Sequence, residues 1–462
     1  MSTKGRREMM TMIEEAAKAA PPPPSFWTPY RAMFCLGAAN LVPWMTLLSL
    51  ADYFAQLYHS NAMEFYFPAI STSALVATSA VLLVVGPRLS FHARIAWPTF
   101  FMSLCMLVVP AVDTGISAGV VAPEVGFILT LGAVLLNAVF SSVAQASLYA
   151  LGSVIGDSST EGLQTGNGLI GLVAVGLRLL TKLGLPPTPG MRTFCVSGLL
   201  ILLASLLAFV ALLNDPAVKA KLEAHERRRT ARNVPTGRSD SVEGQGLGLA
   251  FEDEERDVYK EFEEGEGSWG SLDYPGGDPR LARHGPPSPV TVTVSAALSR
   301  ASVETASVFL VFTTCLATFP GLTTSLVSTT WHLGDWFPLC LVATYNAMDL
   351  VGKGLPSRVR LLTSSTLPYA ALAHLAFLPA FLVLAHPAWL PPLLRSDQLA
   401  LLLVGALGMC TGYIGCSALV LGAERGRSPE ECEVVGQVTS FGLMMGLSCG
   451  SIAGVVLGNF VA

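Results

Sequence analysis

The chain has 462 residues, of which 52% are hydrophobic and only 13% are charged, and its mean hydropathy is +0.54. Soluble domains carry about 25% charged residues, so this composition excludes an ordinary soluble protein and indicates an integral membrane protein. The formal net charge is −5, but 12 of the 28 basic and 16 of the 33 acidic residues lie between Asn214 and Ala301. The net charge therefore describes one segment and says little about partners.

The first 28 residues are polar and include the run Pro21–Pro24. A cleavable signal peptide needs an apolar core of about 7–15 residues, so we predict instead a cytoplasmic tail at 1–28. The nine cysteines form no CxxC pair and no cluster with the spacing of a metal site. Most lie in apolar runs, as expected for small buried side chains. We therefore expect no disulfide, metal or other cofactor.

Apolar runs long enough to cross a bilayer follow one another along the chain. A hydrocarbon core of about 30 Å needs about 20 apolar residues per helix. We predict an all-α integral membrane protein with about eleven transmembrane helices, with ten or twelve as alternatives. The approximate spans are 29–56, 66–87, 94–112, 125–152, 165–184, 193–214, 302–327, 334–353, 365–386, 398–422 and 432–460.

The distribution of Lys and Arg in the short loops predicts the orientation of these helices. With the N-terminus in the cytoplasm, the short cytoplasmic segments hold twelve basic residues, and the opposite side holds three, Lys182, Arg192 and Arg395. Basic residues are enriched on the cytoplasmic side of membrane proteins. The N-terminus is therefore predicted to be cytoplasmic, and eleven spans place the C-terminus outside the cell.

The polar segment 215–301 separates a six-helix half at 29–214 from a five-helix half at 302–462. It is rich in Gly, Pro and charge and poor in aliphatic residues, so it cannot bury a core and is predicted to be a disordered cytoplasmic loop. A simple linker is one interpretation. Regulation, for example by phosphorylation near Ser239 or Ser241, is the other.

Several glycine patterns predict close helix packing. Gly166-Asn-Gly168-Leu-Ile-Gly171 matches GxGxxG, but it follows no strand and lies in no βαβ unit, so a dinucleotide site is not supported. Small residues that let two helices approach explain it better. Glycines repeat every four residues from Gly442 to Gly458, and Gly408 and Gly412 have the same spacing. Such stripes pack membrane helices within a chain or, alternatively, between two copies.

Proline lies in the first predicted helix of each half, at Pro43-Trp44 and at Phe319-Pro320. Proline removes a backbone hydrogen bond and kinks a helix, and paired helix breaks in the two halves of a transporter indicate a central binding site. Both breaks are predicted to lie midway through their helices. Trp44 would then stack on a planar ligand, unless it is an interfacial tryptophan beside an ordinary kink.

Gln145 is an amide within the apolar fourth helix. Its side chain both donates and accepts hydrogen bonds. It is therefore expected either to join two helices or to bind a ligand, and the sequence leaves both possibilities open.

The most informative polar residues are Asp349 and Lys353, which stand four residues apart in an apolar helix. At that spacing the two charges lie on one helical face and neutralise each other, and Asn346 lies on the same face. An ionisable residue at membrane depth costs at least about 2.5–3.5 kcal/mol and usually faces a pathway or cavity. These three residues are the candidate substrate site.

Together, and in this order, these motifs resemble those of the equilibrative nucleoside transporter family. Leu41-Val-Pro43-Trp44 is similar to the family's Pro-Trp-Asn signature, and Gln145-Ala-Ser-Leu and Gly166-Asn-Gly-Leu also match. Asn346-Ala-Met-Asp349-Leu-Val-Gly-Lys353 resembles the family's Phe-Asn-x-x-Asp-x-x-Gly-Arg pattern. The likeness covers the chain from about Tyr30 to its end, apart from the loop.

The resemblance implies an eleven-helix, six-plus-five bundle of the major facilitator type, with a central cavity and alternating access. It implies transport of nucleosides, with the base near the glutamine and the ribose near the aspartate and the basic residue. The substrate-binding positions that it implies are Leu41, Trp44, Gln145, Asn346, Asp349 and Lys353. Two departures bear on substrate range: Met45 replaces the family's Asn, and Lys353 replaces Arg and so lacks the guanidinium fork.

We therefore predict a plasma-membrane transporter of adenosine and related purine nucleosides, of the kind found in protozoa. It would act as a monomer, with a small-molecule nucleoside and the lipid bilayer as its partners and no nucleic acid. A secondary transporter of sugars or other polar solutes is one alternative. A membrane receptor or scaffold that does not transport is another. No nucleophile–base or metal constellation indicates an enzyme.

Overall fold

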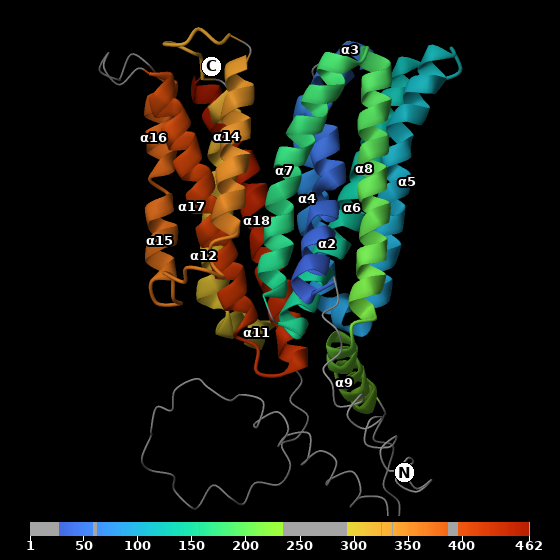
Figure 1. Cartoon of the computed structure of the whole chain (residues 1–462), viewed down its shortest axis with the longest axis vertical. Coiled ribbons are helices and arrows are strands. Elements are labelled where there is room, and N and C mark those ends of the chain that lie inside the picture. Colours follow the sequence, from blue (N-terminus) through green and yellow to red (C-terminus); the bar gives the residue numbers. More distant parts are fainter. Residues whose placement is uncertain are drawn as a thin grey trace, which may run out of the picture. The chain divides into compact units, whose positions relative to one another are not determined.

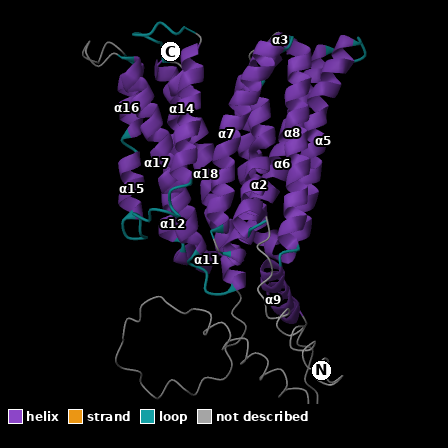
Figure 2. Cartoon of the chain, viewed as in Figure 1, coloured by secondary structure: helices purple, strands orange, loops and turns teal. Residues whose placement is uncertain are grey.

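The computed structural model describes residues 27–58, 62–156, 158–233, 293–324, 326–334, 336–386 and 396–461. Within these ranges every regular element is a helix (Figure 2). The chain divides into a main unit, residues 1–225 with 292–462, and a second unit, residues 226–291. The main unit confirms the predicted all-α architecture.

The first half of the main unit consists of seven helices that alternate in direction (Figure 1). They are α2 (Pro29–Ser49), α3 (Ala51–Tyr58), α4 (Ala62–Val85), α5 (Phe91–Ser117), α6 (Pro123–Ile155), α7 (Ser159–Gly184) and α8 (Pro187–Leu213). Helix ends follow local chemistry, because Ser90 caps α5 by accepting a hydrogen bond from the Ala93 amide, and Gly156 ends α6 with a positive φ of 70°.

The second half follows the polar segment, and in it α15 and α16 form one continuous span, Leu367–Ala385 (Figure 1). Its helices are α11 (Val294–Arg300), α12 (Ser302–Thr318), α13 (Gly321–Thr324), α14 (Trp336–Lys353), α15 (Leu367–His374), α16 (Phe377–Ala385), α17 (Asp397–Ala423) and α18 (Pro429–Val461). We call the two ends of the bundle the α3 end and the α11 end, after the short helices found there (Figure 1).

Nine helical segments in the described residues are long and apolar enough to cross a membrane. They are Ile70–Arg88, Phe91–Ser117, Pro123–Ile155, Ser159–Gly184, Pro187–Leu213, Ser302–Thr323, Leu367–Ala385, Asp397–Ala423 and Pro429–Gly458. The two other predicted spans correspond to α2 and α14, which pack alongside α7 and α17. Nine of the eleven predicted spans are therefore supported by the length and apolar composition of the observed helices. The count of eleven stays a prediction.

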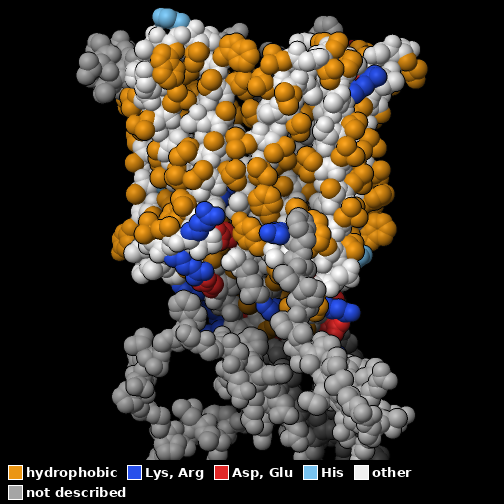
Figure 3. Space-filling model, in the orientation of Figure 1, with side chains coloured by type: hydrophobic (Ala, Val, Ile, Leu, Met, Phe, Trp, Pro, Cys, Tyr) orange, Lys and Arg blue, Asp and Glu red, His pale blue; other side chains and the backbone are white. Residues whose placement is uncertain are grey.

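The outer surface of the bundle is apolar. Leu207, Leu402 and Ile128 leave 71%, 68% and 67% of their surface exposed, as expected for side chains that face lipid rather than water. In Figure 3, hydrophobic side chains cover most of the face in view, and most of the charged ones gather toward the α11 end. This distribution fits a bilayer-embedded protein.

Two predictions about local structure differ from what is observed. The segment 215–301 is not disordered throughout, because α9 (Pro216–Asn233) and α11 form at its two ends; residues 234–292 lie outside the described ranges. Asp215 starts α9 by accepting a hydrogen bond from the Ala217 amide at 3.0 Å. In addition, Pro320 does not lie midway through a helix, because α12 ends at Thr318, whereas Pro43 lies inside α2 as predicted.

The glycine stripe of α18 packs against α12 of the same chain. A Cβ atom added at Gly446 or Gly450 would lie 2.6 Å from the Phe309 carbonyl oxygen or 2.5 Å from that of Thr313. These glycines therefore let the backbone of α18 lie directly against α12. The interpretation of packing within one chain is confirmed, and this part of the stripe is not free to pair with a second copy.

Candidate functional site

The predicted Asp349–Lys353 pair is present near the end of α14. Lys353 Nζ lies 2.7 Å from Asp349 Oδ2, and only 5% of Asp349 and 7% of Lys353 is exposed. The other carboxylate oxygen, Asp349 Oδ1, is buried and has no hydrogen-bond partner among the described residues. The pair therefore neutralises its charges and still leaves one strong acceptor unused.

The glycines of α7 cover this pair. A Cβ atom added at Gly168 would lie 3.1 Å from Lys353 Cδ, and one added at Gly171 would lie 2.2 Å from Asn346 Oδ1. Because neither residue has a side chain, α7 lies directly on the polar stripe of α14. The predicted role of the GxGxxG segment in helix packing is confirmed, and no strand accompanies it in the described residues.

The same segment of α7 contacts α2 on its other side. A Cβ atom added at Gly166 would lie 2.0 Å from the Phe34 carbonyl oxygen, and one added at Gly37 of α2 would lie 2.1 Å from that of Leu163. Helix α7 thus lies between α2 and α14. It links the helix that carries Leu41 and Trp44 to the helix that carries the charged pair.

Helix α17 packs on α14 by the same means. Added Cβ atoms at Gly408 and Gly412 would lie 2.5 Å and 2.3 Å from the carbonyl oxygens of Tyr345 and Asp349. Asn346 is 8% exposed, and its amide nitrogen donates to the Val342 carbonyl at 2.9 Å. The charged residues are thus held on a helix that glycines of two neighbouring helices approach closely.

Gln145 belongs to a separate cluster of amides within the first half. It is 5% exposed, and its Oε1 accepts a hydrogen bond from Asn40 Nδ2 at 3.3 Å. One turn further along α6, the Tyr149 hydroxyl accepts from Gln164 Nε2 at 2.6 Å and from Asn167 Nδ2 at 3.4 Å. In this conformation Gln145 joins helices, which is one of the two predicted roles.

The other members of this polar cluster were not predicted from the sequence. Asn40, Tyr149, Gln164 and Asn167 are all at least 94% buried. The available signal was their spacing, since polar residues three or four positions apart in an apolar helix share a face. Among the described residues, no hydrogen bond or ion pair joins Gln145 to the charged pair of α14.

Leu41 and Trp44 are three residues apart on α2, and both are partly exposed. Leu41 packs against a small apolar cluster of Ala38, Val42 and Ile170. Pro43 lines a small, mostly apolar cavity within the first half, together with Thr46, Leu47, Cys105 and other residues. None of the six predicted site residues lines that cavity.

Further polar contacts join the two halves toward the α11 end. Arg94 of α5 and Glu433 of α18 form a buried ion pair with a 2.5 Å separation. Thr165 Oγ1 donates to the Lys353 carbonyl at 3.3 Å, and the Ser357 amide donates to Glu161 at 3.1 Å. This ion pair and these hydrogen bonds hold the two halves together at the α11 end.

Toward the α3 end, the polar contacts of Asp113 and Asp397 each remain within one half. Asp113 of α5 binds Arg192 of α8 at 3.0 Å. Asp397 of α17 accepts a hydrogen bond from Ser328 at 2.6 Å and one from the Trp331 amide at 2.8 Å. In Figure 1 the helices α7 and α14 diverge toward this end. The conformation is thus closed at the α11 end.

Comparison with known proteins identifies the family. The model of the family described as "Nucleoside transporter" matches residues 131–458. The chain belongs to this family. It is a membrane transporter and not an enzyme, and the resemblance found in its motifs is confirmed; a protozoan origin is not shown.

Relatives cover nearly the whole chain. Equilibrative nucleotide transporter 1 of Arabidopsis thaliana is 26% identical over 446 residues, which are 95% of this chain and 88% of that protein. Equilibrative nucleoside transporter 4 of Homo sapiens is 26% identical over 448 residues, which are 91% of this chain and 81% of that protein.

Solved structures show the fold. A bacterial homologue of the iron transporter ferroportin superposes with a TM-score of 0.55 at 13% identity, covering 95% of this chain and 98% of that one. The major facilitator superfamily proton:xylose symporter XylE gives a TM-score of 0.52 at 12% identity, covering 94% and 93%. The transporter therefore has the predicted major-facilitator-like fold.

The close contact that α7 makes with α14 at Gly168 and Gly171 is directly testable. Gly171→Val should reduce transport at least about tenfold, because its Cβ would displace the Asn346 side chain and separate two packed helices. Gly176→Val in the same helix is the control, since nothing lies within 4 Å of a Cβ added there. Tracer uptake at equal membrane abundance is the measurement, and equal uptake by the two variants would show that this contact is not needed.

Proposed function

We propose that this transporter carries nucleosides across the plasma membrane by alternating access, with adenosine and related purine nucleosides as its substrates. The observation that carries the proposal is the free acceptor of Asp349. Its Oδ2 binds Lys353, whereas its buried Oδ1 has no partner among the described residues. A ribose hydroxyl is the kind of donor that a buried carboxylate oxygen requires. Family membership supplies the class of substrate.

A nucleoside fits this site better than a nucleotide, although relatives named after both occur. A phosphate group needs cations that are not already neutralised. Lys353 is the cation of the α14 stripe, and Asp349 occupies it at 2.7 Å. The adjacent carboxylate would also repel a phosphate. An uncharged ribose avoids both difficulties.

The base would lie toward the first half, near Gln145 and Trp44. Trp44 is partly exposed beside Pro43 and offers an aromatic face. Gln145 contributes an amide that can pair with the edge of a base, provided that its bond to Asn40 rearranges. Leu41 and Asn346 would complete the site. Helix α7, which contacts both α2 and α14, would transmit movement between these two regions.

Alternating access would open the α11 end and close the α3 end. The contacts that must separate are the α7–α14 contact at Gly168 and Gly171 and the Arg94–Glu433 pair. With the N-terminus in the cytoplasm, the α11 end faces the cytoplasm. The transporter would work as a monomer, since its α18 glycines are packed against α12.

The first experiment concerns Asp349. Asp349→Asn should lose most uptake of labelled adenosine in cells that lack nucleoside transport, because it removes the acceptor and leaves the Lys353 ammonium buried without a counter-charge. Lys353→Arg, which keeps the cation, is the control and should retain transport. Uptake above half of the unmodified rate, at matched surface expression, would contradict the assignment.

A double variant separates the loss of substrate binding from the loss of stability. Asp349→Asn with Lys353→Gln removes both charges, so the thermal stability lost in the single variant should return. Transport should not return, because no carboxylate remains for the ribose. Recovered transport in the double variant would show that Asp349 serves only to neutralise Lys353.

The roles of Gln145 and Trp44 are distinguished by competition. Gln145→Ala should change the preference between adenosine and uridine, because a site built on hydrogen bonds loses discrimination when one partner is removed. Trp44→Ala should weaken both substrates, since stacking on an aromatic ring is worth about 1–3 kcal/mol for any base. Uptake of labelled adenosine against unlabelled adenosine, inosine and uridine measures both effects. If Gln145→Ala weakened the binding of all three nucleosides equally, Gln145 would serve only to join helices through its bond to Asn40 and would not contact the base.

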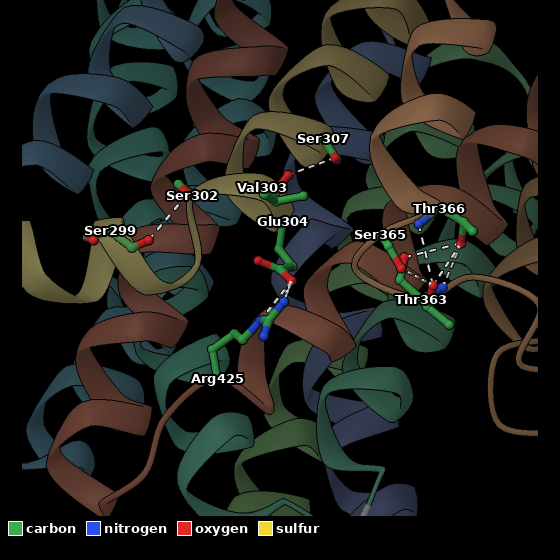
Figure 4. Close-up of polar contacts among 9 residues, drawn as sticks. All are labelled: Ser299, Ser302, Val303, Glu304, Ser307, Thr363, Ser365, Thr366 and Arg425. Atoms are coloured by element: carbon green, nitrogen blue, oxygen red, sulfur yellow. Dashed lines mark hydrogen bonds and ion pairs between the residues drawn. The ribbon is translucent and has the colours of Figure 1, made fainter.

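Transport should follow the nucleoside gradient and not a proton gradient. Three buried carboxylates that could in principle carry a proton all have cationic partners, since Asp349 binds Lys353, Glu433 binds Arg94 and Glu304 binds Arg425 at 2.7 Å (Figure 4). Each of the three is thus held in an ion pair rather than left without a cation. Adenosine uptake should therefore stay unchanged when a protonophore collapses the gradient. A severalfold fall would show proton coupling, and uptake of sugars alone would favour the other class of transporter.

A further inference from the structure

Helix α9 is more than the start of a linker, because its first turns are fixed to the bundle. Val218 is 1% exposed. Lys221 Nζ donates a hydrogen bond to the Ile155 carbonyl at the end of α6, at 2.7 Å, and Leu222 packs against the large apolar cluster that includes Phe209 and Leu212. The strongly polar composition of α9 gave no indication of this docking.

His225, the next buried residue of α9, reaches the ion pair between the halves. It is 1% exposed, and its Nε2 lies 2.9 Å from Glu433 Oε2. The other oxygen, Oε1, lies 2.5 Å from Arg94 Nη2. One carboxylate of the second half is thus bound by two side chains of the first half, from α5 and α9.

Aromatic and charged groups surround this contact. The ring of Phe91 lies under Arg94 at 4.5 Å and 5.7 Å from the ring of His225. The charged groups that face His225 are Arg94 from α5 and Glu433 from α18, while Lys221 and Glu226 are its neighbours on α9. The contact between His225 and Glu433 thus lies next to a buried ion pair.

Separation of the halves at the α11 end must break both bonds to Glu433. We propose that His225 is a positioning residue for the transport cycle: it holds the second oxygen of Glu433, ties α9 to the closed α5–α18 contact and slows the opening of this end. This inference does not depend on which solute is carried.

A buried reporter can test the opening directly. Ser153 of α6 is 7% exposed and lies where Gly436 of α18 approaches, since a Cβ added there would be 2.6 Å from its Oγ. Ser153→Cys is introduced into the full chain with its nine native cysteines replaced by alanine, and its labelling by a soluble maleimide is followed in proteoliposomes. Each rate is divided by that of a cysteine at Lys219, whose side chain is 65% exposed, at the same pH.

The protein with His225 unchanged should give slow relative labelling. His225→Leu should label about tenfold faster, because the polar contact with the Glu433 carboxylate is removed. His225→Lys, which places an ammonium within reach of Glu433, should label slowly again. His92→Leu replaces the histidine of α5, whose ring lies 6.1 Å from that of Phe209, and should keep the slow labelling.

Two results would overturn the proposal. One is slow labelling in a correctly inserted His225→Leu protein. The other is fast labelling of a correctly inserted His225→Lys protein, a result that decides the matter even if His225→Leu does not fold. Neither result bears on the substrate, because no nucleoside is present in the measurement.

Discussion

The requirement that charge be neutralised away from water governs this structure. The outer face is apolar, so ionised side chains inside the bundle must bind one another, as Asp349 and Lys353 do within one helix. Arg94 and Glu433 do the same between two halves of the chain. An isolated ion at membrane depth costs several kcal/mol, so breaking either pair is costly. The Arg94–Glu433 pair therefore holds α5 of the first half against α18 of the second.

Glycine supplies the complementary constraint. Helices α2, α7, α14 and α17 approach until backbone oxygens of one lie where a Cβ of the next would be, as at Gly166, Gly412 and Gly37. Without a hydrophobic driving force between helices in lipid, such close packing is a main source of association. Such packing is also easily reversed, because two helices that meet at glycines can separate without moving interdigitated side chains. The contact between α7 and α14 combines this packing with the charged pair beneath it.

Features encoded locally could be predicted from the sequence, and features that depend on distant residues could not. The four-residue spacing placed Asp349 and Lys353 together, and four-residue repeats predicted the α18 stripe. By contrast, Arg94 and Glu433 are 339 residues apart, and no periodicity links them. The helix α9 was missed for the same reason, because its burial depends on Glu433 and on the end of α6. Helices α2 and α14 were predicted among the eleven spans but are not among the nine described segments that are long and apolar enough to cross a membrane, and they carry five of the six predicted site residues.

The unused oxygen of Asp349 suggests how substrate binding drives the change of conformation. A ligand shifts an equilibrium only by the difference in its affinity for the two states. In the closed arrangement Gly168 and Gly171 cover the α14 stripe, and Asp349 Oδ1 has no partner among the described residues. A buried acceptor left without a hydrogen bond costs about 1–3 kcal/mol. In the proposed mode of binding, a ribose hydroxyl that reached Oδ1 would remove this cost once α7 had moved aside. Binding would therefore favour the opened contact over the closed one, and the contact would close again once the substrate left.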